Sequence, residues 1–312
     1  MVVARYLVRC LAVLVLVLAP SGRAFAQATE TELLYYKFDP PLDTDIVLAV
    51  ETASALVMPD VEHVEGWSHE VVIRLDRLEG NEFTGTFQLR NVVNVENAQD
   101  DIQFLIARAL EGEIYPLRVA AVGLVTEVDW VAIRARIEDQ LPRLTVPAHA
   151  AAIKAVLPVF TDPPKAVLRP VNAAAQAYFL TFRRDGELNE RNDIGPATYF
   201  GLDPAKVEIG GGFDPEVDAF ILDWLVTSEP EIATEALGSQ LRSIIGLADP
   251  QDGTGASDIL ETAIAEGIEA AEDGYAIYVP DEGLMREVTV NAIMAAGDFA
   301  HVTRIKVTRV SP

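Results

Sequence analysis

The sequence predicts an α+β fold, in which a curved antiparallel sheet from the N- and C-terminal strands packs against helices inserted by the middle of the chain. Three observations predict it. Apolar and polar residues alternate near the N-terminus, the same alternation returns near the C-terminus, and helical periodicity prevails in several segments between them. Because an alternating strand buries only one of its faces, the predicted sheet needs a layer of helices against that face.

The N-terminal strands are expected over residues 33–38, 45–56, 70–78 and 82–95. In the third of these, Val71, Ile73 and Leu75 alternate with Arg74 and Asp76, so the apolar side chains share one face. The break at residues 79–81 is compatible with a tight hairpin. These segments together predict an antiparallel meander with one face in water.

The periodicity becomes helical after two aspartates at positions 100 and 101. A helix is expected there, with Gly112 as its stop signal. A strand over residues 115–128 follows. Asp129 is a candidate N-cap for the next helix, which Pro142 or Pro147 ends. A short alanine-rich helix over residues 148–159 completes the first half of the chain.

The second half is less regular before residue 218. Prolines punctuate residues 161–215, and the three glycines at 210–212 predict a flexible stretch. The apolar segment 218–227 fits a strand or a helix. Helices are then expected over residues 231–247 and 257–271, and strands over 275–279, 284–295 and 299–310.

The last strands pair most easily with the early meander. Such pairing predicts one domain over residues 27–312, since a single sheet would then contain both ends of the chain. A split near residue 159 into two α+β halves is the alternative.

The first 26 residues have the pattern of a secretory signal peptide. Arg5 and Arg9 precede an apolar run, and the small residues Ala24 and Ala26 form a small-x-small cleavage site. An uncleaved membrane anchor is the alternative, but a run of about ten apolar residues is short of the roughly 18–20 that span a bilayer. We therefore expect the mature protein to begin at Gln27, to be periplasmic or extracellular, and to keep no stable membrane anchor.

Cysteine usage and charge limit the functions open to the exported chain. The only cysteine, Cys10, lies within the leader, so the mature chain is expected to have no disulfide, thiol nucleophile or cysteine metal ligand. Loss of the leader's three arginines moves the net charge from −24 to −27. A surface this negative repels phosphates and anionic head groups, which argues against nucleic-acid partners and electrostatic membrane attachment.

No motif predicts a catalytic residue, a metal or a cofactor. Ser68 and His69 are adjacent on a strand, so their side chains point to opposite faces and cannot form the hydrogen bond that activates a serine. Two acidic loops near residues 185–196 and 249–258 are off register for calcium. The four histidines are scattered and predict no ligand set: His63, His69, His149 and His301.

Two short segments carry a resemblance. Residues 36–41 (YKFDPP) open the meander, and residues 128–130 (VDW) lead a strand into an amphipathic helix. This arrangement resembles one that recurs in uncharacterised exported α+β proteins of Gram-negative bacteria. Over residues 33–145 and 218–310, the order of strands, helices and closing strands is also similar to the curved half-barrels of periplasmic lipoprotein carriers and related lipid-binding folds. The resemblance implies an apolar groove between the concave sheet and the helices.

The leading hypothesis is a non-enzymatic periplasmic binding or carrier protein for an apolar ligand such as a lipid or an acyl chain. The candidate lining residues are large, apolar and inward-facing: Phe83, Phe87, Ile102, Leu105, Trp130 and Trp224. The same residues would form an ordinary core if no groove is open. One alternative is an envelope assembly or interaction protein without a small ligand. The other is a hydrolase that uses two carboxylates as acid and base, which no sequence spacing reveals.

The signal-peptide prediction can be checked directly. N-terminal sequencing of the protein recovered from the periplasm or the medium should begin at Gln27, because signal peptidase cleaves after the small residue of such a site. A chain that still carries its first 26 residues in that fraction would contradict the prediction.

Overall fold

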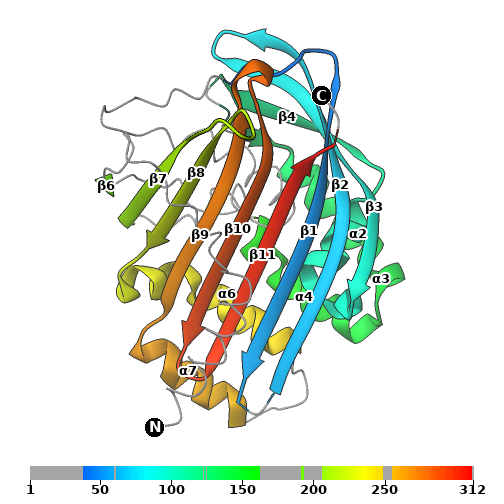
Figure 1. Cartoon of the computed structure of the whole chain (residues 1–312). Coiled ribbons are helices and arrows are strands. Elements are labelled where there is room, and N and C mark those ends of the chain that lie inside the picture. Colours follow the sequence, from blue (N-terminus) through cyan, green and yellow to red (C-terminus); the bar gives the residue numbers. More distant parts are fainter. Residues whose placement is uncertain are drawn as a thin grey trace.

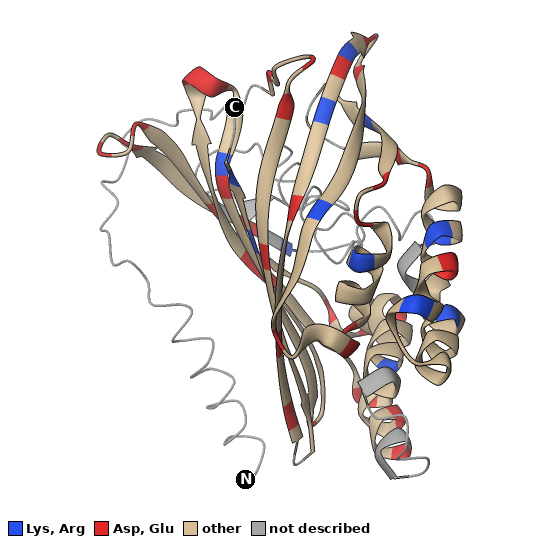
Figure 2. Cartoon of the chain, turned by 90° about the vertical axis from the view of Figure 1, so that its right-hand side faces the viewer, with Lys and Arg blue, Asp and Glu red and all other residues tan. Residues whose placement is uncertain are grey.

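The computed structural model describes residues 38–59, 61–121, 123, 125–161, 191–192, 206–248 and 255–310. The named strands in these ranges form one antiparallel sheet, in the order β5-β4-β3-β2-β1-β11-β10-β9-β8-β7-β6. Seen from the side, the sheet is curved and unclosed, and helices pack on one side of it (Figure 2). The predicted α+β architecture is confirmed.

Figure 1 shows the strands as two groups that meet in the middle of the sheet. The group from the first half of the chain contains β1 (Asp45–Met58), β2 (Val61–Glu79), β3 (Glu82–Glu96), β4 (Ile114–Ala120) and β5 (Val125–Val128). The group from the second half contains β6 (Arg191–Asn192), β7 (Lys206–Asp214), β8 (Ala219–Thr227), β9 (Glu269–Val279), β10 (Leu284–Ala296) and β11 (Phe299–Arg309).

The helices come from three connections. Helix α2 (Ile102–Leu110) lies between β3 and β4, α3 (Trp130–Leu144) and α4 (Pro147–Thr161) lie between β5 and β6, and α6 (Pro230–Ala248) and α7 (Gly255–Glu266) lie between β8 and β9. Two short 3₁₀ turns, η1 (Ala98–Asp100) and η5 (Pro280–Glu282), link neighbouring elements. Across the described ranges, no helix combines the length and the apolar character that a membrane crossing needs.

The pairing of β1 with β11 joins the two groups of strands. The register runs from Leu48 opposite Arg309 to Val57 opposite Ala300. On its other edge β1 pairs with β2 along its whole length. The C-terminal strands therefore pair with the early meander, as the sequence predicts.

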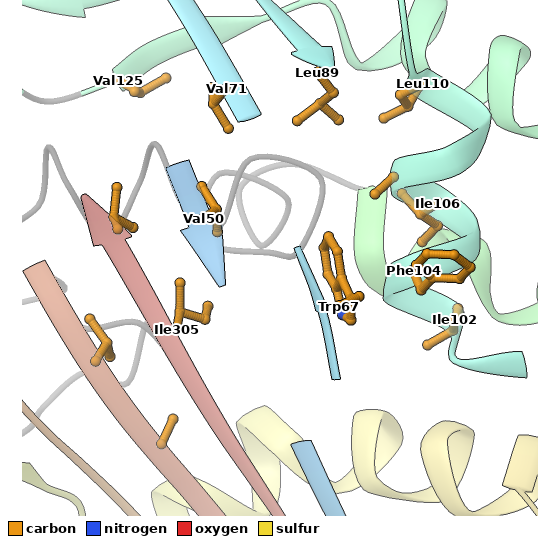
Figure 3. Close-up of a cluster of buried hydrophobic side chains, with 14 of the residues drawn as sticks. Val50, Trp67, Val71, Leu89, Ile102, Phe104, Ile106, Leu110, Val125 and Ile305 are labelled. Carbon is orange, nitrogen blue, oxygen red and sulfur yellow. The ribbon is translucent and has the colours of Figure 1, made fainter. Parts of the chain in front are cut away.

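Two-residue alternation places the core on the side of the sheet that the helices cover. In β1, Ile46, Leu48 and Val50 are buried while their sequence neighbours are less so. Helix α2 lies against this face, and eight of its nine residues are buried. Figure 3 shows the side chain of Trp67 from β2 close to those of Phe104 and Ile106 from α2.

Several elements differ from the sequence-based expectation. Strand β2 begins at Val61 and β9 at Glu269, well before the strands expected from residues 70 and 275. Residues 115–128 form two paired strands, β4 and β5, instead of one. The helix expected to reach residue 271 ends at Glu266, because Gly267 takes a φ of 123° and turns the chain into β9. The expected flexible stretch at 210–212 belongs to β7, where a Cβ on Gly211 would lie 2.3 Å from the Ile221 carbonyl oxygen. The glycine there permits the close approach of β7 to β8.

The segments expected over residues 33–37 and 171–183 lie outside the described residues.

The indole ring of Trp224 packs over Gly274, which has no side chain. Trp224 on β8 lies directly opposite Gly274 on β9, and its Nε1 donates a hydrogen bond to the buried carboxylate of Glu272 at 2.9 Å. A Cβ on Gly274 would lie 2.3 Å from Trp224 Cζ2 and 2.5 Å from the Thr289 carbonyl oxygen. The indole therefore covers the glycine and fills the room above it.

Replacing Gly274 with alanine should lower the free energy of unfolding by about 1–3 kcal/mol, the usual cost of overpacking a core. Chemical denaturation followed by tryptophan fluorescence measures it. Gly212→Ala is the matched control, because no atom lies within 4 Å of its added Cβ, and its effect should stay within about 0.5 kcal/mol. Equal losses in both variants would contradict the packing proposed for Trp224.

Candidate functional site

The six residues predicted to line a groove are all buried in the hydrophobic core: Phe83, Phe87, Ile102, Leu105, Trp130 and Trp224. Several of them are packed against other side chains of the core. The ring of Phe83 contacts that of Phe38 at a centroid distance of 5.5 Å, and the ring of Phe87 lies at the same distance from that of Tyr115. Of the six, Ile102 also lines a cavity, which opens at one end of the layer between sheet and helices.

This cavity has a volume of about 780 Å³ and lies where β1, β2 and β11 meet the helices. Its walls are formed by Ser54 and Leu56 of β1, residues 62–65 of β2, Asn97, Gln99, Asp100, Asp101, Ile102, Val146, His149, Ile244 and His301. Ligand pockets typically measure roughly 300–1,000 Å³. The cavity is therefore large enough for a small molecule. We call it the hairpin-end cavity, because its lining includes the end of β1 and the beginning of β2.

The hairpin-end cavity has an apolar part and a polar part. Leu56 of the sheet, Ile102 of α2 and Ile244 of α6 supply apolar surface from three different elements. Acidic and imidazole side chains supply the polar part. This combination of apolar walls with a few polar groups is typical of sites for small ligands.

Glu65 and Asp101 form a hydrogen-bonded pair of carboxyl groups in the polar part. Asp101 is the N-cap of α2, and its Oδ1 accepts a hydrogen bond from the backbone N–H of Phe104 at 2.7 Å. A hydrogen bond between two carboxyl groups requires a proton on one of them. The local sequence explains the position of Asp101, because α2 begins at the next residue.

The environment of Glu65 favours its protonated form. Burial, followed by the nearby charges of Asp101 and Asp100 and the hydrogen bond with Asp101, raises the pKa of Glu65 to about 8. Burial also raises the pKa of Asp101, but the N–H of Phe104 stabilises its ionised form. At neutral pH the pair therefore holds one proton, which we place on Glu65.

Three histidines also line the cavity, His63, His149 and His301, and the last two have nitrogen atoms near the site that bear on its chemistry. His301 is 6% exposed, lies opposite Leu56 in the sheet and has no hydrogen-bond partner within the described residues. Burial lowers the pKa of His301 to about 4, so its imidazole is neutral at pH 7. Nδ1 of His149 lies 3.8 Å from Oδ1 of Asp100, and its Nε2 is buried without a partner among the described residues.

The geometry of the carboxyl pair limits what it can do chemically. Glycoside hydrolysis needs two carboxyl groups about 5–9.5 Å apart, with the scissile bond between them. Glu65 and Asp101 are in direct hydrogen bond, and one oxygen of Asp101 is already committed to capping α2. No group of three His, Cys, Asp or Glu in the described ranges has an arrangement suited to a metal ion. The pair can bind a proton or a cationic donor.

Sequence reasoning did not find Glu65, Asp101 or His301 as a group. They come from β2, the start of α2 and β11, so only the folded sheet brings them together. One signal was present. In the segment 61–69, His63 and Glu65 interrupt the apolar face of the strand, although the segment belongs to the same strand as the regular segment that follows.

The comparisons with known proteins find only weak structural similarity and no similarity of sequence family. No protein-family model matches the chain, and no curated protein matches its sequence. Lipovitellin, from a structure on lipid–protein interactions, has 7% identity and a TM-score of 0.39 over 88% of this chain. The chain spans only 25% of the lipovitellin chain.

Two bacterial proteins are still more distant. DynF from the dynemicin biosynthesis pathway of Micromonospora chersina has 8% identity and a TM-score of 0.21, covering 94% of this chain and 95% of its own. A hot dog fold protein from Alicyclobacillus acidocaldarius has 14% identity and a TM-score of 0.18, covering 87% and 81%. TM-scores this low carry no functional argument, and function is argued from the site.

The shared proton predicts how stability depends on pH. Because the pKa of Glu65 is about 8 in the folded protein and near 4.5 in the unfolded chain, the folded state binds more protons between these values. The free energy of unfolding should therefore fall as pH rises toward 8. His69 and His301, whose pKa values burial lowers to about 3 and about 4, act with the opposite sign, but only below about pH 6.5.

Urea denaturation at pH 7 and pH 9 separates these effects. The wild type should lose stability between the two values, whereas Glu65→Gln should lose less because no proton leaves residue 65. Glu70→Gln, on the same strand but paired with Ala49 away from the cavity, should behave as the wild type. Equal pH dependence in all three proteins would contradict the protonated state of Glu65.

Proposed function

We propose that the protein is an exported binding or carrier protein for a small ligand with an apolar part, such as a lipid or an acyl chain. The ligand would lie in the hairpin-end cavity. The observation that carries this proposal is a cavity of about 780 Å³ whose walls come from both the sheet and the helices.

The apolar walls support the proposal. Leu56, Ile102 and Ile244 approach the cavity from β1, α2 and α6. An acyl chain between them would replace water on both the ligand and the protein. Burying about 200 Å² of apolar surface contributes about 5 kcal/mol before the cost of association. An acyl chain of medium length can therefore bind in this cavity, and the protein does not need a groove that runs through the whole core.

The expected leader supports the location. A signal peptide with cleavage after Ala26 would deliver the chain to the periplasm or the medium. An apolar molecule that crosses an aqueous compartment needs an apolar enclosure. The leader lies outside the described residues, so export remains part of the proposal.

A carboxylate-dependent hydrolase is the second candidate, and the Glu65–Asp101 pair is the observation that favours it. A pair that shares one proton occurs in some hydrolases, where it supplies both an acid and a base. Hydrolysis of a peptide or ester panel by the wild type, lost in Glu65→Gln, would favour this candidate over a carrier. Binding explains more of the site, because it also uses the apolar walls.

Filling the cavity should block the ligand. Ser54 faces the cavity from β1, and Ser54→Trp should weaken binding of a neutral single-chain ligand such as 1-decanol at least tenfold. Isothermal titration calorimetry and native mass spectrometry measure the loss. Ala53→Trp is the matched control, because Ala53 is the preceding residue of the same strand and is exposed on the other face.

Two results would overturn the proposal. One is a clean apoprotein mass from the native source together with no uptake from a panel of single-chain lipids. The other is undiminished binding in Ser54→Trp, which would place any ligand elsewhere on the protein.

A further inference from the structure

We propose that the polar part of the hairpin-end cavity is a subsite for an ammonium group, so that the preferred ligand is a single-chain amine. This inference rests on the proposed function and names the head group of the ligand. It is carried by the juxtaposition of Glu65, Asp101 and His301 around one cavity.

The charges around the cavity select for a cation. Its lining contains four acidic residues, and none of the lining residues that the structure describes is a lysine or an arginine. The charged and titratable groups that line the cavity together with Glu65 come from β2, η1, the start of α2, α4 and β11: Glu62, His63, Asp100, Asp101, His149 and His301. β1 and α6 contribute Ser54, Leu56 and Ile244, which carry no charge. A phosphate or a carboxylate head group would meet these carboxyl groups without a lysine or an arginine of the lining to pair with.

An independent observation points to a ligand at the same place. His301 is more than nine-tenths buried, lines the cavity and has no hydrogen-bond partner within the described residues. Its imidazole therefore has unused hydrogen-bonding capacity at the cavity wall, which a bound molecule can take up. A neutral imidazole offers one lone pair as acceptor.

An ammonium group matches these acceptors in number and charge. It has three N–H donors and no acceptor. Carboxylate oxygens of Glu65 and Asp101 and the free imidazole nitrogen of His301 would take one donor each. A hydroxyl group has a single donor and no charge, so it would bond one acceptor and leave the proton of the Glu65–Asp101 pair in place.

The proton balance of binding follows from the shared proton. In the free protein, Glu65 carries the proton that its hydrogen bond with Asp101 needs. A bound ammonium ion supplies the positive charge in its place, Glu65 ionises, and the proton passes to the solvent. Binding therefore exchanges one cation for one proton, and the amine itself keeps all its protons and all its bonds.

Calorimetry with three probes of equal chain length tests the inference: decylamine, 1-decanol and decanoate. At pH 7 and below micellar concentrations, decylamine should bind the wild type at least tenfold more tightly than 1-decanol, and decanoate most weakly. Repeating the decylamine titration in buffers of different ionisation enthalpy should reveal release of up to one proton per ligand. The affinity for decylamine should rise between pH 6 and pH 8 and then level off.

Glu65→Gln should abolish the preference for the amine and the proton release. Glu70→Gln, which makes the same substitution on the other face of β2, should keep both. The proton release of the wild type is a readout that needs no variant, so the inference stays testable even if Glu65→Gln folds poorly.

The outcomes separate this inference from the proposed function. If 1-decanol binds and decylamine binds no more tightly, the ammonium subsite is wrong and the carrier function stands. If decylamine keeps its preference in Glu65→Gln, the preference comes from the general negative charge of the protein, and the subsite is again wrong. If none of the three probes binds the wild type, the carrier function itself falls.

Discussion

The pairing of β1 with β11 is the constraint on which the rest of the structure depends. It holds strands from the two ends of the chain side by side in the middle of the sheet, with β2 to β5 on one side and β10 to β6 on the other. The helices from each half then share one concave face. The hairpin-end cavity needs this arrangement, because Leu56 of β1 and His301 of β11 are direct neighbours and Ile244 of α6 and Asp101 of α2 face them from opposite halves of the chain.

The layer between sheet and helices changes character along its length. Beneath α2 it is a packed apolar core, in which Trp67 meets Phe104 at a ring distance of 6.2 Å. At the start of α2 it becomes polar, where Asp101 both caps the helix and lines the cavity. The N–H of Phe104 offsets part of the cost of burying the Asp101 carboxylate, so the helix start makes a buried charge tolerable there.

Much of the fold could be predicted from the sequence, because periodicity reports which face of a strand or helix is buried. The alternation of Val71, Ile73 and Leu75 identified the buried face of β2, and the cap at Asp129 identified the start of α3. Close backbone approaches were not predictable, since the role of Gly211 depends on Ile221 of the neighbouring strand. The site was not predictable for the same reason. Its residues come from separate elements, and the first of them lie in the part of β2 where alternation fails.

That failure of alternation is informative about function. A strand selected only for stability would continue its apolar face to the end of β2 and fill the space beside α2, because buried charges seldom stabilise a fold as well as packed apolar groups do. The chain instead places Glu65 beside Asp101 and leaves His301 open to the same cavity. Strongly perturbed ionisable groups of this kind gather at functional sites. The departure from the pattern that builds the sheet therefore lies at the end of the sheet where we propose that a ligand binds, and it is the reason to seek that ligand among molecules with both an apolar chain and a hydrogen-bond-donating head.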